Sequence, residues 1–325
     1  MKRRAFIAAL GSAAAWPVVA RGQQPKPIIG CLINGSREAS DFMIVPFRQG
    51  LADTGYVEGS NVAIEYRWSD GHNERMPELA AELLVLQVSV IVTPSGASGA
   101  LAAKRLTTTI PIVFLTGGDA IELGVVGSLS KPDANLTGVS GAANSLVTKQ
   151  LGLLSEFAPK SSPFALLTNP GSPNTGRLTA NTEAAAKTLG RDLEIVGAGD
   201  VSQFDKAFAQ LSERHVGGLV VPQNAFFESQ RERIVTLASR ERIPTMYAMR
   251  EFVRAGGLMS YGALYSDLHR QLGIYAEKIL RGTKPSELPV FQPSKFEFVI
   301  NLKTARSLGL NVPISMQLLA DEVIE

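Results

Sequence analysis

The sequence predicts an α/β protein of two similar lobes, in which helices cover parallel sheets and a hinge joins the lobes. Short β-rich runs alternate with segments of helical periodicity after Pro27, the pattern of parallel sheets flanked by helices. A unit of strand, loop, helix and strand occurs twice, in residues 90–113 and 219–246. The chain has 325 residues, and at about 150 residues per domain this length predicts two cores.

The first half of the chain is expected to form five strands. They are residues 28–33, 62–68, 90–93, 112–115 and 136–140. Between the first two strands, Phe47 and Leu51 lie on one helical face, and Gly55 is placed to end that helix. Apolar residues recur with helical spacing in residues 74–87, which predicts an amphipathic helix there.

A second series of elements follows. Its strands are expected at residues 164–168, 193–196, 218–221, 245–247, 258–261 and 296–300. Helical stripes lie in residues 147–158, 204–211 and 268–279, and a closing helix over residues 303–308 is stopped by Gly309. Together the two series predict two Rossmann-like lobes.

No change of composition marks a long linker, so the lobes are expected to be joined by short crossings near residues 138–143 and 256–262. The predicted lobes are residues 27–141 plus about 262–290 at the N-terminal side, and 142–261 plus about 291–325 at the C-terminal side.

Residues 1–22 have the pattern of a cleavable secretory signal. A basic run at residues 2–4 precedes an apolar stretch at residues 6–15 and small residues near 18–20. The apolar stretch is shorter than the about 20 residues that span a membrane. The two arginines of the basic run fit a twin-arginine signal as well as an ordinary Sec signal. We therefore expect a mature protein in the periplasm, monomeric and without a membrane span.

Composition argues against several classes of protein. Charged residues make up 19%, with 32 Lys+Arg against 30 Asp+Glu and no block of like charge, which argues against a nucleic-acid arm or a polybasic membrane patch. The single cysteine, Cys31, follows a segment that resembles a lipoprotein box, but its surroundings fit a buried first strand better. One cysteine and three isolated histidines predict neither a disulfide framework nor a metal site, and no cofactor is expected.

Catalytic signatures are missing from the sequence. It contains no Gly-x-Ser-x-Gly elbow and no Gly-Lys-Ser/Thr loop, and Gly197-Ala198-Gly199 lacks the third glycine of a dinucleotide fingerprint. The sequence therefore favours a binding protein over an enzyme.

Small polar residues follow the predicted strands, where parallel sheets bind their ligands. The candidate ligand-binding residues in or beside these loops are Asn34, Ser36, Phe42, Thr93, Ser95, Gly96, Ala97, Ser98, Thr116, Gly117, Asp119, Asn144, Asn169, Asn174, Gln223, Asn224, Phe227 and Tyr261. Each loop alone also fits an ordinary turn or helix cap, and Asp119 fits a cap as well as a partner for an ammonium group. The aromatic residues fit a core as well as a cleft wall.

We expect backbone N–H groups at residues 95–98, at the head of a helix, to hold a ligand carboxylate. Asp119 would then hold an amino group, and Asn174, Gln223 and Asn224 would reach the ligand from the second lobe after closure. Phe42 and Phe227 would contact the apolar body of the ligand.

Several segments resemble the tryptophan/tyrosine-type branch of ABC transporter substrate-binding proteins. They are residues 47–68, 135–140, 256–262, 279–290, 296–305 and 320–325. The resemblance implies a type I periplasmic-binding-protein fold with three crossings between the lobes and a cleft that closes about a hinge. It also implies delivery of a small solute to an inner-membrane permease. The chain differs from the family pattern in the cleft loops at residues 34–38 and 119–120, and such loops choose the ligand.

The sequence therefore predicts the periplasmic solute-binding component of an ABC importer. Its ligand would be a small carboxylate, either an aromatic amino acid or a related aromatic or branched acid. The alternative is a ligand sensor that signals to a membrane receptor kinase. No nucleic-acid partner is expected.

Overall fold

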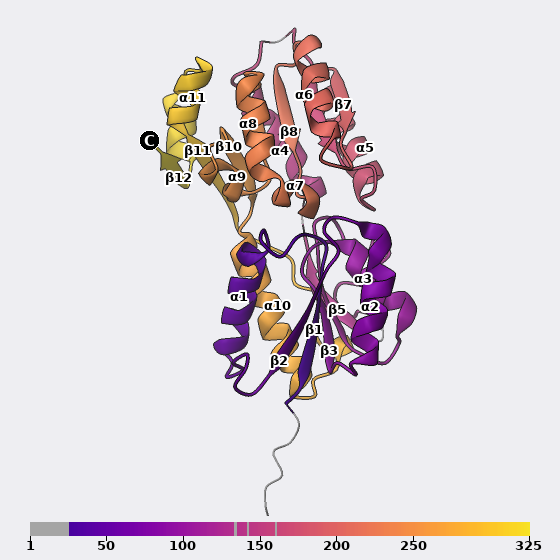
Figure 1. The fold of residues 1–325 in the computed structure, drawn as a ribbon. Coiled ribbons are helices and arrows are strands. Elements are labelled where there is room, and N and C mark those ends of the chain that lie inside the picture. Colours follow the sequence, from indigo (N-terminus) through magenta and orange to yellow (C-terminus); the bar gives the residue numbers. More distant parts are fainter. Residues whose placement is uncertain (1–25, 133–134, 142, 160) are drawn as a thin grey trace, which may run out of the picture.

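The computed structural model describes residues 26–132, 135–141, 143–159 and 161–325, with the side chains of residues 143–145 left out. The predicted signal at residues 1–22 lies outside the described residues. The described chain forms two α/β lobes, one above the other (Figure 1). The predicted fold class is thereby confirmed.

The first lobe contains a five-stranded parallel sheet of order β2-β1-β3-β4-β5. Its strands are β1 (Ile28–Ile33), β2 (Ala63–Trp68), β3 (Val90–Thr93), β4 (Ile112–Thr116) and β5 (Leu136–Ser140). Helices α1 (Asp41–Ala52) and α10 (Tyr265–Leu280) cover one face, and α2 (Met76–Val85) and α3 (Ala97–Leu106) cover the other (Figure 1). A short 3-10 turn, η1 (Asn73–Arg75), precedes α2, so the helix predicted at residues 74–87 is slightly shorter than expected.

Helices α1 and α10 come together through two glycines. A Cβ on Gly50 would lie 2.0 Å from the carbonyl oxygen of Arg270, and one on Gly273 would lie 2.3 Å from that of Phe47. The backbones therefore touch directly, which fixes α10 to the first lobe although its sequence follows the second.

The second lobe has a seven-stranded sheet of order β12-β11-β10-β9-β8-β6-β7, parallel except where β10 meets β11. Its strands are β6 (Phe164–Thr168), β7 (Leu193–Gly197), β8 (Gly218–Val221), β9 (Thr245–Tyr247), β10 (Met259–Ala263), β11 (Phe296–Asn301) and β12 (Glu322–Ile324). Its helices are α4 (Ala143–Ser155), α5 (Thr175–Thr188), α6 (Gln203–Glu213), α7 (Ala225–Ser229), α8 (Arg231–Arg240), α9 (Arg250–Arg254), α11 (Leu302–Leu308) and α12 (Ile314–Leu319). Strand β12 and helix α12 were not predicted, because both are too short to show a clear periodicity.

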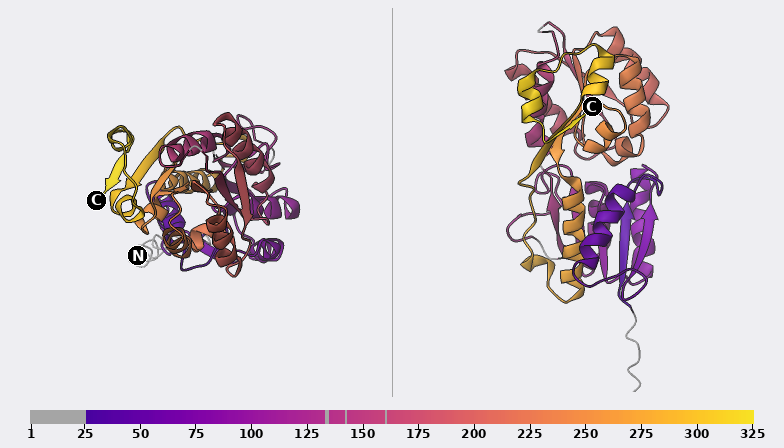
Figure 2. Two further views of the ribbon diagram at one scale, coloured as in Figure 1. Left: turned by 90° about the horizontal axis from the view of Figure 1, so that it is seen from above. Right: turned by 90° about the vertical axis from the view of Figure 1, so that its left-hand side faces the viewer.

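Three segments cross between the lobes on one side of the molecule (Figure 2). The first joins β5 to α4 and the second joins β10 to α10. The third returns from η2 (Pro285–Glu287) to β11. The crossing expected at residues 256–262 lies later, at Leu264, because β10 stays paired with β11 as far as Ala263. The returning segment is held against β5, since Phe291 accepts from the Ser140 N–H and donates to the Gly138 carbonyl.

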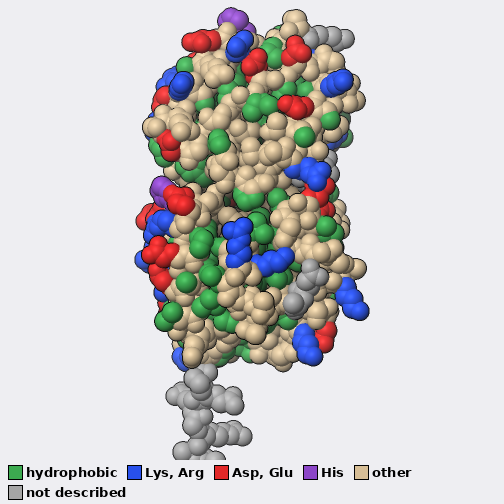
Figure 3. Space-filling view, turned by 90° about the vertical axis from the view of Figure 1, so that its right-hand side faces the viewer, with side chains coloured by type: hydrophobic (Ala, Val, Ile, Leu, Met, Phe, Trp, Pro, Cys, Tyr) green, Lys and Arg blue, Asp and Glu red, His purple; other side chains and the backbone are tan. Residues whose placement is uncertain are grey.

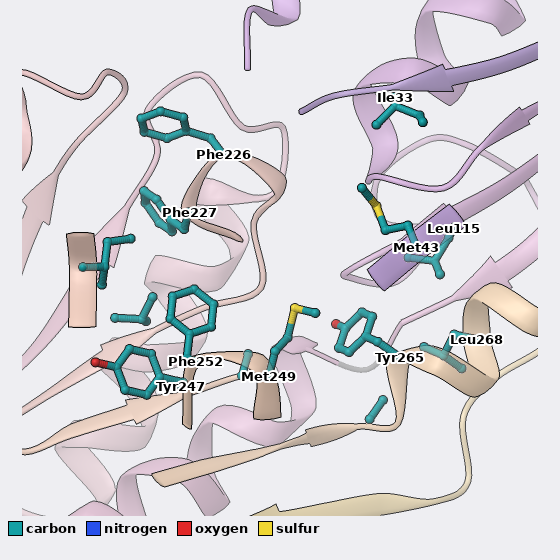
Figure 4. Close-up of a cluster of buried hydrophobic side chains, with 14 of the residues drawn as sticks. Ile33, Met43, Leu115, Phe226, Phe227, Tyr247, Met249, Phe252, Tyr265 and Leu268 are labelled. Atoms are coloured by element: carbon teal, nitrogen blue, oxygen red, sulfur yellow. The ribbon is translucent and has the colours of Figure 1, made fainter. Parts of the chain in front are cut away.

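The apolar core runs from one lobe into the other. Figure 4 shows Tyr265 of the first lobe beside Met249 of the second, and both belong to one buried cluster that also contains Met43 and Phe227. The lobes are therefore in contact, in a closed arrangement. Within the described residues, no helix combines the length and the apolar character needed to cross a membrane.

Candidate functional site: a cleft between the lobes

A cavity lies between the lobes, where loops at the carboxyl ends of strands from both sheets face each other. Its first-lobe wall consists of Asn34, Asn73, Ser95, Gly96, Ala97, Ser98, Gly117, Gly118 and Leu123. Its second-lobe wall consists of Ser172, Pro173, Asn174, Gln223, Asn224 and Ala225. Figure 3 shows the outline of the molecule drawn in slightly where the two lobes meet. The position matches the rule that open parallel sheets bind ligands at their carboxyl edge.

The closed cavity is small. Its volume is about 40 Å³, which is room for about three water molecules. Two contacts hold its rim: Asn73 Nδ2 donates to the carbonyl of Gly171 across the gap at 2.8 Å, and Arg177 Nε lies 3.3 Å from a carboxylate oxygen of Glu122. A ligand as large as an amino acid can therefore enter only if the walls move apart.

The loop from β3 to α3 makes the first-lobe wall mainly from backbone. Gly96 is the N-cap of α3 with φ of 101°, a conformation that favours glycine, and it has no side chain to cap the helix. Its own N–H donates to Leu115, while the following Ala97 and Ser98 line the cavity. The first N–H groups of a helix have no partner within the helix and carry partial positive charge. This wall is therefore suited to an anion.

Buried side chains support this loop from behind. The Ser95 hydroxyl accepts from the Asn34 N–H. His269 of α10 lies with Nε2 3.2 Å from the Pro94 carbonyl oxygen, and burial lowers its pKa to about 4. The imidazole is thus neutral near pH 7, and its Nε2–H donates to that carbonyl. Thr93, the last residue of β3, is buried with its Oγ1 unpartnered among the described residues.

Asn34 belongs to a network that links three loops. Its Nδ2 donates to Asn73 Oδ1 at 2.8 Å, and its Oδ1 accepts from the Ser69 hydroxyl at 2.8 Å. Because Asn73 in turn donates to Gly171, the network extends from the end of β1 to the second lobe. Asn34 therefore shapes the wall that it also lines.

The second-lobe wall is made of side chains. Asn224 Oδ1 accepts from the N–H groups of Phe226 and Phe227 and so caps α7, at 3.0 and 3.4 Å. Gln223 Nε2 donates to Glu228 Oε1 at 3.0 Å. Glu228 lies behind Gln223 and is only 4% exposed.

The Glu228 carboxyl is an unusual acid. Burial raises its pKa to about 8, the negative charge of Glu251 adds to the rise, and the Gln223 amide and Arg231 oppose it. Glu228 was not predicted as a site residue, because nothing in the sequence Ala225-Phe226-Phe227-Glu228-Ser229 indicates that its side chain is buried.

Several predicted residues line the cavity and others do not. Lining positions are Asn34, Ser95, Gly96, Ala97, Ser98, Gly117, Asn174, Gln223 and Asn224. Thr93, Thr116 and Asn169 are buried at strand ends behind the walls. Ser36 lines a separate open groove between the first lobe and α8. The side chain of Asn144 lies outside the described part of the structure.

Four candidate residues lie outside the cavity lining and have structural roles: Asp119, Phe42, Phe227 and Tyr261. Asp119 Oδ1 accepts from the N–H groups of Ile121 and Glu122, at 2.7 and 3.1 Å, so the side chain caps a turn and does not line the cavity. In this structure Asp119 therefore has the capping role, which is one of the two roles that its position in the sequence predicted.

The aromatic candidates are also placed away from the cavity. Phe227 is fully buried against Phe204 and Phe226, because α7 turns it into the apolar core. Phe42 packs edge-on against His269 at 5.8 Å. Tyr261 on β10 stacks with Phe296. The predicted aromatic cleft wall is therefore absent from the described lining of the closed cavity.

Comparison with known proteins gives matches over most of the chain. A family model described as ABC transporter substrate binding protein matches residues 32–324. A tyrosine-binding protein of Clostridioides difficile (strain R20291) is 25% identical over 264 residues, which are 81% of this chain and 75% of that protein. The predicted resemblance is confirmed.

Two solved structures extend the comparison. The ABC domain from Streptococcus pneumonia in complex with L-Trp has a TM-score of 0.84 at 24% identity, covering 92% of this chain and 100% of that chain. The ligand-free, open structure of the substrate-binding protein CD0873 from Clostridium difficile has a TM-score of 0.64 at 24% identity, covering 92% and 99%. These and further likenesses confirm the periplasmic-binding-protein fold.

Proposed function

The chain belongs to the family of ABC transporter substrate-binding proteins, and we propose that it is the periplasmic solute-binding component of an importer. It binds an aromatic or branched amino acid, or a related carboxylic acid, between its lobes and delivers it to an inner-membrane permease. The observation that carries this proposal is a cavity walled by both lobes, with the uncapped head of α3 on one side and polar side chains on the other.

The head of α3 supports a carboxylate ligand. Ala97 and Ser98 follow a glycine N-cap and line the cavity, so a carboxylate there would gain hydrogen bonds to the first N–H groups of the helix and the favourable helix terminus. Helix termini contribute about 0.3 to 2 kcal/mol to such an interaction. The neutral His269 behind Pro94 holds the loop without adding a charge of its own.

Closure about the crossings supports a transport role. A ligand that touches both walls binds the closed form more tightly and shifts the population toward it by that difference in affinity. When the lobes close, their surfaces beside the cleft come together and form one continuous surface. In an open form these two surfaces would be apart. The relatives named for tyrosine and L-Trp support an amino acid as the ligand.

Mass spectrometry of small molecules released from the purified, denatured protein tests the proposal directly. We expect an amino acid or a related carboxylic acid. Calorimetry with L-tryptophan, L-tyrosine, L-phenylalanine and L-leucine should then rank the ligands, and small-angle scattering should show a smaller radius of gyration on saturation. Release of an uncharged solute, together with no heat from any of the four amino acids, would contradict the proposal.

A further inference from the structure

An amino-acid ligand has a second charged end, and its ammonium group needs an acceptor in the cleft. Asp119 does not supply one in this structure, because it lies outside the cavity lining, where its Oδ1 accepts two backbone N–H groups. The acceptor has to come from another side chain that reaches the cavity.

Gln223 offers such an acceptor. It lines the cavity from the second lobe, and its amide nitrogen is committed to Glu228 at 3.0 Å. An ionised carboxylate only accepts hydrogen bonds, so it holds Nε2 toward itself and turns Oε1 the other way. The free acceptor atom of the amide then points away from Glu228.

The first lobe is shaped to receive this oxygen. A Cβ on Gly117 would lie 2.1 Å from Gln223 Oε1, so the missing side chain of Gly117 makes room for the amide in the closed form. Gly117 and Gly96 both line the same cavity. An acceptor from the second lobe and the N–H groups of α3 from the first therefore lie on opposite walls of one small space.

We infer that Gln223 and Glu228 form the amino-group end of the ligand site. Glu228 is a positioning residue: as a carboxylate it orients the Gln223 amide so that Oε1 accepts from the ligand ammonium, and its charge stabilises that ammonium from behind. This inference rests on the proposed function, since it assigns the second end of an amino acid whose first end lies at α3.

A proton on Glu228 allows the opposite arrangement. A protonated carboxyl has an O–H that can donate to Gln223 Oε1, and in that arrangement Nε2 turns toward the cleft and the acceptor for an ammonium group is lost. The groups that face Glu228 are Glu251 from α9, Arg231 from α8 and Tyr265 from α10 across the lobe boundary. With a pKa of about 8 the carboxyl is mostly protonated near pH 7, so binding of an ammonium group has to release that proton.

The direction of the pH effect follows from this linkage. Because the bound ammonium favours the ionised carboxylate, affinity for an amino acid rises with pH toward 8. If the bound carboxyl is fully ionised, the gain between pH 6 and pH 8 is up to about 50-fold. A desamino acid, which has no ammonium group, should show no such gain.

Calorimetry with L-tryptophan and its desamino analogue 3-indolepropionate tests this, at pH 6, 7 and 8 and in two buffers of different ionisation enthalpy. Wild type should bind L-tryptophan with release of nearly one proton at pH 7 and should bind the analogue with none. Glu228→Gln should weaken L-tryptophan at pH 8 at least tenfold, remove its pH dependence and change the analogue less than threefold. Asp119→Asn is the matched control, expected to leave the ratio of the two affinities unchanged.

Gln223→Met is a second variant that removes the acceptor and leaves the buried carboxyl intact. It should weaken L-tryptophan and spare the analogue, and it keeps the test valid if Glu228→Gln fails to fold by circular dichroism. Equal losses for both ligands, or a flat pH profile for wild type, would overturn the inference. If wild type binds no amino acid at all, the proposed function fails instead, which is a different result.

Discussion

The two walls of the cleft offer hydrogen bonds in different ways: the first-lobe wall uses backbone groups, and the second-lobe wall uses side chains. The first-lobe wall is proposed to present the backbone N–H groups of Ala97 and Ser98, supported by a histidine that burial keeps neutral. The second-lobe wall presents an amide whose orientation depends on the buried acid Glu228. The path of the backbone fixes the groups of the first-lobe wall. On the second-lobe wall, the protonation state of Glu228 sets the orientation of the Gln223 amide. In the proposed site, a ligand that bridges the walls would therefore meet the fixed partial positive charge of the α3 N-terminus at one end and an amide oriented by Glu228 at the other.

The contrast extends to stability, because the two buried titratable groups act in opposite directions. The pKa of His269 is lowered in the folded protein, whereas that of Glu228 is raised. Burial disfavours the charged form of each, but the charged form of a histidine is the protonated one. Variants of each wall test these differences.

The largest expected effect is on the stability of the ligand-free protein through Glu228. Its folded pKa of about 8 exceeds the ordinary value of 4.5, so the folded state binds more protons over this window and loses stability as pH rises through it. The loss between pH 4.5 and 8 is on the order of 3 to 5 kcal/mol for this buried group. Urea unfolding of Glu228→Gln across the window should show a flatter profile than wild type. Parallel profiles would contradict the assignment.

His269 should give the opposite slope. Its folded pKa of about 4 lies below the ordinary 6.5, so the unfolded state binds more protons between these values and stability falls as pH drops from 6.5 to 4. The expected contribution is about 3 kcal/mol. In His269→Gln, which can still donate to Pro94, this part of the pH dependence should disappear from denaturant titrations. A variant that kept the full slope would assign the effect to carboxylates elsewhere.

Substitutions at Gly117 and Gln223 test how closely the two walls approach each other when the lobes close. In Gly117→Val the new side chain occupies the space of Gln223 Oε1, so closure should be weakened by about 1 to 3 kcal/mol, or fivefold to over a hundredfold in ligand affinity. Adding Gln223→Ala should restore closure, measured by small-angle scattering, but not the preference for an amino group. Failure of the second substitution to restore closure would show that Gly117 is needed for another reason.

A substitution at Gly96 tests the first-lobe wall, which consists mainly of backbone groups. Gly96→Ala meets no atom within 4 Å, but its φ of 101° strains an alanine and tilts the first N–H groups of α3. We expect a loss of about 1 to 2 kcal/mol in carboxylate binding, equal for an amino acid and its desamino analogue. Gly124→Ala is the control, since Gly124 has φ of 71° and also meets nothing within 4 Å, yet lies outside the cavity lining. It should lower stability and leave affinity unchanged.

The sequence predicted the backbone groups of the first-lobe wall better than the side chains of the second-lobe wall. A short buried strand followed by Pro94-Ser95-Gly96 fixes where a loop ends and a helix begins, so the N–H groups can be placed from local pattern alone. Whether Asp119 or Phe227 faces a ligand depends on the direction of a side chain, which tertiary packing decides. Glu228 shows the limit most clearly, because only the packing of α7 between the lobes distinguishes it from a surface acid.

The smallest expected effect lies at the rim, outside both walls. Arg177 of α5 and Glu122 of the first lobe form an ion pair across the gap at 3.3 Å, with both side chains partly exposed. Such pairs contribute about 0 to 1 kcal/mol and are screened by salt. Because the two residues lie on different lobes, opening would separate the pair, and Arg177→Gln should weaken ligand binding by at most about fivefold at low salt and less at high salt. Arg233→Gln, which removes an exposed pair with Asp205 inside the second lobe, is the matched control and should leave affinity unchanged at every salt concentration. A loss for Arg177→Gln that did not shrink with salt would mean that Arg177 acts by packing and not by charge.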